Sequence, residues 1–441
     1  AEALKEYLEH ITFEYEHINF VLTKARRRDR LVSEAELETV FVPLSIQDPT
    51  APEKTKMELT RRRKISAESP DDLWQQEKDG QSSLLTIKEV IGRFNHFILI
   101  GPPGCGKTTL LRYLTLAFGQ GQAEAKLGWQ KEPLLPILVP LRNFSRFLAD
   151  NKAEYTNPAP LALRRFIDDY FNEHDLELPP GFFHERLKAG RCLVMLDGLD
   201  EVADRDERAR VAQFVTQFIK RYEKAGNVFA LASRPRGYQQ VEEYLPKPIV
   251  CEVQDLSPED RDQLVRNLLI ELEPDPRRLA RDTADLIADI YEKERVESLS
   301  RNPLFCTTLV LVYKYQEGKL PERRVDVYQE LVNLMLGFWE THKANREGIA
   351  DVHDLVHMDG TGRTFAAERD AIEAKERALM FLAFWMLKEG HTELPKPDAI
   401  EQLADYFRKE EGATEEKKEK WAQRFLDVAH QRSGLFVEYD T

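Results

Sequence analysis

Short apolar runs between residues 84 and 255 alternate with segments in which apolar residues recur every three or four positions. Each run is short and apolar enough to form a strand that is buried on both faces. Strands that alternate with helices in this way are typical of parallel β-α-β units. We therefore predict an α/β domain with a parallel sheet, whose strands are Phe97–Ile100, Leu135–Leu141, Cys192–Leu196, Val228–Ala232 and Ile249–Val253.

Helical spacing dominates the chain after this region. Ser257 followed by Pro258 predicts a capped helix start, because serine accepts a backbone N–H there and proline suits the first turn. Near the N-terminus, apolar positions from Leu4 to Ile18 predict another helix, and the segment Val40–Leu44 predicts a short strand. The predicted later helices cover residues 258–271, 277–299, 304–316, 325–343, 370–389, 397–411 and 416–431.

These patterns divide the sequence into parts of different character. Residues 51–80 carry many charges and few large apolar side chains, so we predict a linker or a long surface loop there. The predicted parts are an N-terminal helical and linker segment over 1–83, the α/β domain over 84–256, a helical domain over 257–320, and a second helical region over 321–441.

The first predicted strand leads into a glycine-rich turn and an apolar helix, and this segment satisfies the pattern GxxxxGK[ST]. Glycines let the backbone close around an anion, and N–H groups at the helix start can bind a β-phosphate. Lys107 can reach the β- and γ-phosphate oxygens, and the Thr108 hydroxyl can ligate Mg²⁺. The predicted nucleotide-binding residues of the turn are Gly101, Gly104, Cys105, Gly106, Lys107, Thr108 and Thr109.

Acidic residues follow the strand Cys192–Leu196, at the sheet edge where ligands of open α/β folds bind. We predict that Asp197 binds Mg²⁺ through its water shell. Glu201 is the preferred candidate for orienting or deprotonating the attacking water, with Asp200 as support for the metal shell. The same acids would also suit the dipole of a helix N-terminus without any catalytic role.

Arg234 ends another predicted strand, within Ser233-Arg234-Pro235. In a P-loop sheet, the end of a strand beside the one that carries Asp197 lies next to the γ-phosphate. We therefore predict that Arg234 senses this phosphate or stabilises charge during its transfer.

Composition narrows the functional classes. The formal net charge of −14 argues against a protein that mainly coats nucleic acid or an anionic membrane. The longest apolar run, Ala378–Leu387, is about half of the ~20 residues that a membrane span needs. The four cysteines lie far apart without CxxC spacing, which favours reduced thiols in the cytoplasm. Because the sequence stops directly after the strand-like Gly434–Val437, we expect it to be a fragment.

With these motifs in this order, the chain resembles the NACHT branch of the signal-transducing ATPases with numerous domains (STAND), similar to NOD-like receptor proteins. Besides the phosphate loop, the acidic motif and Ser233-Arg234-Pro235, the matching segments are Val40–Leu44, Leu134–Leu141 and Arg301-Asn302-Pro303-Leu304. The segments Val327–Met335 and Arg432–Glu438 resemble parts of a winged helix. The resemblance implies an AAA+-like P-loop NTPase fold, an all-α helical domain, and the start of a winged-helix domain.

In this family, ATP and ADP with Mg²⁺ operate a switch of innate immunity in animals or of antiphage defence in bacteria. The resemblance therefore implies slow ATP hydrolysis, and self-association into an oligomer when an unknown trigger activates the protein. It also implies that Pro303 packs near the adenine, and that a winged-helix histidine which holds ADP lies beyond Thr441.

Two other classes remain open. An AAA+-like motor acting on polypeptide or nucleic acid would need pore loops, and the acidic charge makes nucleic acid an unlikely partner. A small-molecule kinase would need a compact acceptor pocket with a lid, rather than a long helical region after the sheet.

Overall fold

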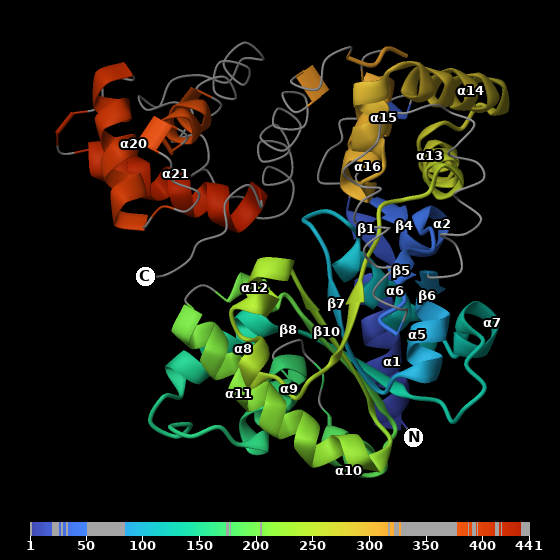
Figure 1. Cartoon of the computed structure of the whole chain (residues 1–441), viewed down its shortest axis with the longest axis vertical. Coiled ribbons are helices and arrows are strands. Elements are labelled where there is room, and N and C mark those ends of the chain that lie inside the picture. Colours follow the sequence, from blue (N-terminus) through green and yellow to red (C-terminus); the bar gives the residue numbers. More distant parts are fainter. Residues whose placement is uncertain are drawn as a thin grey trace. The chain divides into compact units, whose positions relative to one another are not determined.

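The computed structural model describes residues 2–19, 26–27, 30–31, 34–50, 84–172, 176, 178–202, 205–315, 318–321, 326–327, 377–386, 388–389, 394, 396–410, 414–415 and 417–433 (Figure 1). The predicted linker over 51–80 lies outside these residues, as do nearly all of the predicted helix over 325–343 and the segment after Ser433. The chain forms two compact units. The first contains residues 1–18, 36–268 and 300–307, and the second contains 19–35, 269–299 and 308–441.

A parallel five-stranded sheet is the centre of the first unit, with the strand order β11-β7-β10-β9-β8. Ala230 of β10 lies beside Phe97 of β7 and Met195 of β9, and all three side chains are buried. The five strands confirm the predicted ones to within one residue at each end, because runs buried on both faces must be apolar throughout. The strands are β7 His96–Ile100, β8 Leu135–Pro140, β9 Cys192–Asp197, β10 Val228–Ser233 and β11 Ile249–Glu252.

Helices cover both faces of this sheet, with α1, α5 and α6 on one side and α8, α9 and α11 on the other (Figure 1). The buried Tyr7 of α1 donates a hydrogen bond of 2.7 Å from its hydroxyl to the Pro136 carbonyl of β8. The helices of the first unit are α1 Glu2–Tyr15, α2 Leu37–Val40, α5 Ile87–Arg93, α6 Lys107–Gly119, α7 Ala123–Leu127, α8 Leu141–Asp150, α9 Pro160–Asn172, α10 Phe182–Lys188, α11 Arg205–Tyr222 and α12 Pro235–Gln239. Short 3₁₀ helices lie at Leu199–Glu201, Glu223–Ala225 and Glu242–Tyr244.

The predicted strand Val40–Leu44 is wrong. Val40 ends α2, and the residues up to Leu44 have no regular structure. The side chains of Val40, Val42 and Leu44 are buried, and the residues between them are more exposed. The alternation of apolar residues therefore reflects burial, although this segment pairs with no strand that the structure describes. The strand is β5 Ser45–Gln47, which pairs antiparallel with β6 Leu84–Thr86. The other short strands are β1 His17–Asn19, β2 Arg26–Arg27, β3 Arg30–Leu31 and β4 Glu34–Glu36.

The described residues after β11 lie mostly in helices, as predicted. The Ser257 hydroxyl accepts a hydrogen bond of 3.1 Å from the Asp260 N–H, which confirms the predicted helix cap. The predicted helix over 277–299 is instead two helices, because the backbone of Lys293 leaves the helical conformation between them. The helices are α13 Pro258–Leu272, α14 Pro276–Glu292, α15 Glu294–Ser300, α16 Pro303–Tyr315, α20 Lys396–Glu410 and α21 Lys418–Ser433. In the part of the chain that the structure describes, no helix is long and apolar enough to cross a membrane.

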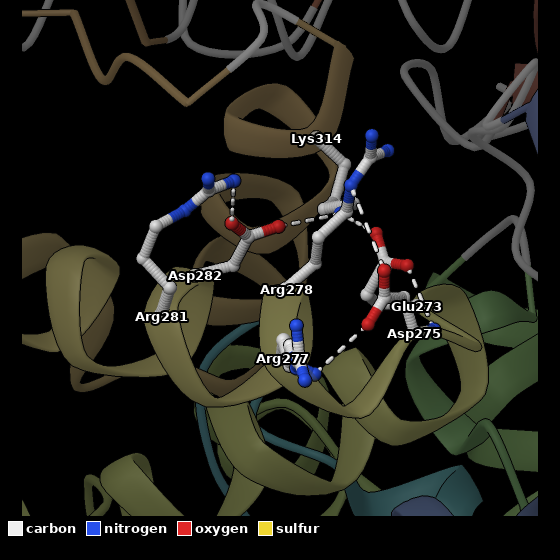
Figure 2. A network of polar contacts seen from close by, with 7 residues as sticks. All are labelled: Glu273, Asp275, Arg277, Arg278, Arg281, Asp282 and Lys314. Atoms are coloured by element: carbon white, nitrogen blue, oxygen red, sulfur yellow. Dashed lines mark hydrogen bonds and ion pairs between the residues drawn. The ribbon is translucent and has the colours of Figure 1, made fainter.

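An ionic network joins helices of the second unit (Figure 2). Lys314 of α16 lies between Glu273 and Asp282, and its Nζ is 2.8 Å from a carboxylate oxygen of each. The three side chains are only 16%, 10% and 9% exposed, respectively. Arg281 contacts the other oxygen of Asp282 at 2.9 Å. Burial acts to raise the pKa of Glu273 and of Asp282, but their hydrogen bonds to Lys314 and other donors hold both pKa values below the usual range.

Candidate nucleotide-binding site

The loop between β7 and α6 has a backbone that only glycine adopts easily. Gly104 and Gly106 have φ angles of +73° and +91°, which are in the left-handed region. At Gly101, an added Cβ would lie 2.6 Å from the Cys105 sulfur, so a side chain there would displace the loop. Gly106 caps α6 without a side-chain hydrogen bond. The first N–H groups of this helix, near Thr108 and Thr109, are therefore available to an anion at its positive end.

The side chain of Lys107, the first residue of α6, folds back onto the preceding loop. Its Nζ donates hydrogen bonds to the carbonyls of Gly101 at 2.8 Å and Pro102 at 3.2 Å. The Cys105 sulfur is 3.6 Å from the same Nζ. The Cys105 side chain is buried, and burial raises the pKa of its thiol. The loop carbonyls therefore hold the ammonium group at the place where the sequence predicts phosphate binding.

The predicted metal-binding residues, Thr108 and Asp197, lie together. Thr108 is in the first turn of α6, Asp197 ends β9, and their side chains are joined by a hydrogen bond. Burial raises the pKa of Asp197, although the bond to Thr108 and the charge of Arg112 act in the opposite direction. The described residues contain no cluster of three or more His, Cys, Asp or Glu side chains for a metal. Mg²⁺ in nucleotide sites needs only one or two protein oxygens beside phosphate and water, and a hydroxyl next to a carboxylate fits that requirement.

Asp200 and Arg234, which the sequence places far apart, form a two-point contact. One Asp200 oxygen accepts the Arg234 backbone N–H at 2.8 Å, and the other accepts from the guanidinium Nε at 2.9 Å. Asp200 is 8% exposed. An added Cβ at Gly237 would lie 2.5 Å from the Asp200 Cβ, so glycine allows α12 to pack closely against this residue. Asp200 thus fixes the direction of Arg234, a role that the sequence alone did not indicate.

Glu201 follows Asp200 and is exposed at the edge of the sheet. Neighbouring protein atoms displace part of the water around its carboxyl and raise its pKa, and the charges of Asp197 and Asp200 raise this pKa further. Arg142 and Arg234 act to lower this pKa. The sequence did not single out Arg142, although its place two residues after the end of β8 resembles that of Arg234 directly after β10.

Pro303, predicted to lie near the adenine, is the first residue of α16, and its neighbours contact the phosphate loop. The Asn302 side-chain amide donates to the Pro103 carbonyl at 3.1 Å. The Leu304 N–H donates to the Gly104 carbonyl at 3.1 Å. On the loop's other flank, an added Cβ at Gly106 would lie 3.1 Å from Leu44. Asn302, Leu304 and Leu44 were not predicted individually, because only the folded chain brings them to the loop.

Two family models match this chain. A family model of the NACHT domain matches residues 95–271. A model of the winged helix-turn-helix domain C-terminal to NACHT matches residues 324–441. Solved structures similar to this chain include domain III of the replication initiation protein DnaA from Thermotoga maritima, with 14% identity, a TM-score of 0.28, and coverage of 60% of this chain and 93% of that chain. AMPPCP-bound DnaA from Aquifex aeolicus has 16% identity and a TM-score of 0.25, and the match covers 67% of this chain and 87% of that chain. No curated protein matches the chain.

The two family models occur in the order expected from the motifs, with the sheet and its phosphate loop in the first match and α20 and α21 in the second. The loop geometry, the Thr108–Asp197 contact and the parallel sheet account for nucleotide binding in physical terms. The chain belongs to the NACHT family of P-loop NTPases.

Proposed function

We propose that this protein is a switch operated by ATP and ADP, which hydrolyses ATP slowly with Mg²⁺ and assembles into an oligomer when activated. The assembled form would drive an effector in innate immune or antiphage defence signalling, in the cytoplasm, after an unknown trigger. The observation that carries the nucleotide part of the proposal is the contact between Thr108 and Asp197 beside the phosphate loop.

The site residues have distinct tasks in this proposal. Lys107 exchanges its loop carbonyls for phosphate oxygens, and the N–H groups at the start of α6 bind the β-phosphate. Thr108 and Asp197 hold Mg²⁺, which when bound neutralises charge on the phosphate oxygens. Glu201 orients the attacking water and accepts its proton, for which a raised pKa is favourable. Arg234, held by Asp200, contacts the γ-phosphate and thus distinguishes ATP from ADP.

A switch also needs a difference in free energy between its states. Reversing a population from 1:99 to 99:1 takes about 5.5 kcal/mol of differential binding. Contacts of Lys107 and Arg234 with one γ-phosphate would supply only a part of this amount. A trigger, or a second copy of the chain in the oligomer, is therefore expected to contribute the remainder.

The test is to purify the chain, identify any retained nucleotide, and compare its mass in solution with ADP and with a non-hydrolysable ATP analogue. We expect ADP on a monomer and larger particles with the analogue.

Lys107→Ala should reduce nucleotide binding below detection, because the loop loses its phosphate-binding cation. The matched control is Lys188→Ala, which removes an exposed lysine of α10.

Tight ADP binding by the Lys107 variant would contradict the site assignment. A stable hexamer whose rapid turnover is stimulated by a polypeptide or nucleic acid would instead favour the AAA+-like motor.

A further inference from the structure

The segment that precedes α16 holds two consecutive peptide groups of the phosphate loop. The Asn302 amide donates to the carbonyl of Pro103, and the Leu304 N–H donates to the carbonyl of Gly104, both at 3.1 Å. These carbonyls belong to the peptide groups that join residue 103 to 104 and residue 104 to 105. Both peptide groups are therefore oriented by residues that lie about two hundred positions later in the chain, as the separation of 199 between Asn302 and Pro103 shows.

The orientation of a carbonyl also fixes the neighbouring N–H. The structure has no cis peptide bonds among its described residues, and in a planar trans peptide the N–H points opposite to the C=O. Because the carbonyls of Pro103 and Gly104 point toward the 302–304 segment, the N–H groups of Gly104 and Cys105 point away from it. The Cys105 N–H is turned toward the Pro102 carbonyl at 3.4 Å, inside the curve of the loop. The contact with residues 302–304 therefore fixes the direction of two consecutive N–H groups of the phosphate loop.

Asn302 joins this contact to the start of α16. Its Oδ1 accepts the Leu304 N–H at 3.0 Å, as the cap of the helix, while its Nδ2 donates to the loop. The approach is close, because an added Cβ at Gly104 would lie 2.6 Å from the Leu304 Cβ and 3.0 Å from Asn302 Oδ1. Gly104 is thus needed both for its φ angle and for the approach of residues 302–304.

We propose that Asn302 is a positioning residue that shapes the phosphate loop for nucleotide and transmits the state of the loop to the first turn of α16. The proposal rests on the proposed nucleotide binding and adds a residue that does not itself touch the nucleotide. Displacement of the Pro103 carbonyl on nucleotide exchange would weaken the bond to Asn302 Nδ2, and the same side chain caps the helix.

The test separates the two hydrogen bonds of Asn302. In Asn302→Ser, the hydroxyl can still cap α16 but is too short to reach the Pro103 carbonyl. We expect the affinity for fluorescently labelled ADP to fall three- to tenfold, the range that corresponds to one hydrogen bond, with little change in Tm. Asn302→Asp keeps the cap as well and replaces the donor by a negative charge, so its affinity should fall further. The control Thr307→Ala removes a hydrogen bond to the Pro303 carbonyl in the same helix, away from the loop.

Hydrogen exchange supplies a second readout that a merely structural role would not change. ADP should slow amide exchange of residues 304–306 in the parent chain, and this effect should be lost in Asn302→Ser. If the parent chain does not bind ADP, the proposed function is overturned. If the parent chain binds ADP, but Asn302→Ser has the same affinity and the same ADP-dependent protection, the role of Asn302 is wrong. A lowered Tm with unchanged affinity would also overturn it, because Asn302 would then only stabilise the helix.

Discussion

Carboxyl groups in two regions of this protein have pKa values shifted in opposite directions. At the carboxyl edge of the sheet, the pKa values of Asp197 and Glu201 are raised, with loss of hydration as the first cause. In the second unit, Glu273 and Asp282 are largely buried, but their pKa values are lowered. Loss of hydration acts to raise the pKa in both regions, so the difference must come from the partners of each carboxylate.

The two regions distribute their cations differently. In the second unit, the Nζ of Lys314 is 2.8 Å from both carboxylates, and Arg281 adds a contact to Asp282 (Figure 2). At the sheet edge, the close guanidinium contact of Arg234 is made with Asp200, while Asp197 has a neutral hydroxyl as its hydrogen-bond partner. In the helical network each carboxylate contacts a cation directly, whereas at the sheet edge Asp197 has the Thr108 hydroxyl as its hydrogen-bond partner, and Arg112 and Lys107 act on it only through their charge. This is the electrostatic arrangement of a binding site.

The largest effect is expected when the shared cation of the helical network is removed. Lys314→Met keeps the length of the side chain but leaves Glu273 and Asp282 next to each other without the ammonium group. We expect the free energy of unfolding at pH 7 to fall by about 3 kcal/mol, since breaking a buried ion pair leaves uncompensated charge. Chemical denaturation measures this value. The control is Lys388→Met, where the lysine is exposed and its Nζ is 4.0 Å from a carboxylate oxygen of Glu389. Equal effects of the two substitutions would show that the network does not stabilise the second unit.

A smaller effect is expected when the same kind of contact is weakened at the sheet edge. Asp200→Asn removes one charge from the pair with Arg234, although the amide oxygen can still accept one hydrogen bond. We expect a loss of about 1 kcal/mol in stability, and a fall in ATP turnover of about 100-fold because Arg234 is no longer held in place. The matched control is Asp289→Asn, which weakens the Lys293–Asp289 ion pair of 3.0 Å away from the site. Unchanged turnover in Asp200→Asn would mean that Arg234 needs no positioning by this carboxylate.

The sequence was sufficient where a short segment carries its own physical constraints. The five buried strands and the phosphate loop were predicted because apolar runs and glycine spacing are local features. The two-point contact between Asp200 and Arg234 was not, because it depends on the adjacency of β9 and β10 in the sheet. The same holds for Asn302, whose contact with Pro103 spans 199 positions. The break at Lys293 was also missed, because the apolar periodicity continues through it.

The smallest change in the free energy of unfolding is expected for Asp197→Asn, and its sign is opposite to that for Lys314→Met. A raised pKa means that the folded protein binds this proton more readily than the unfolded chain does. The stability contributed by such a carboxyl is present at low pH, and it is lost as the pH rises through the unfolded value of about 4 and the higher folded value. An asparagine does not ionise, so Asp197→Asn avoids the loss of stability at neutral pH. We expect the free energy of unfolding of the nucleotide-free protein to rise by about 1 kcal/mol at pH 7, as is common when a functional site is neutralised. The gain should shrink as the pH falls through the folded pKa of Asp197, because the parent carboxyl then becomes neutral as well.

The pH profile of Lys314→Met should be the mirror image. Glu273 and Asp282 have lowered pKa values, so the stability that they contribute is present above pH of about 4 and is lost as the pH falls through their folded values. The cost of Lys314→Met should therefore be largest at pH 7 and shrink in acid. Denaturation of the parent chain and both variants from about pH 3.5 to pH 7, at an ionic strength of about 0.1 M, measures the two profiles. If Asp197→Asn lost stability at pH 7, Asp197 would be a structural acid like Asp282, and the contrast between the two regions would be wrong.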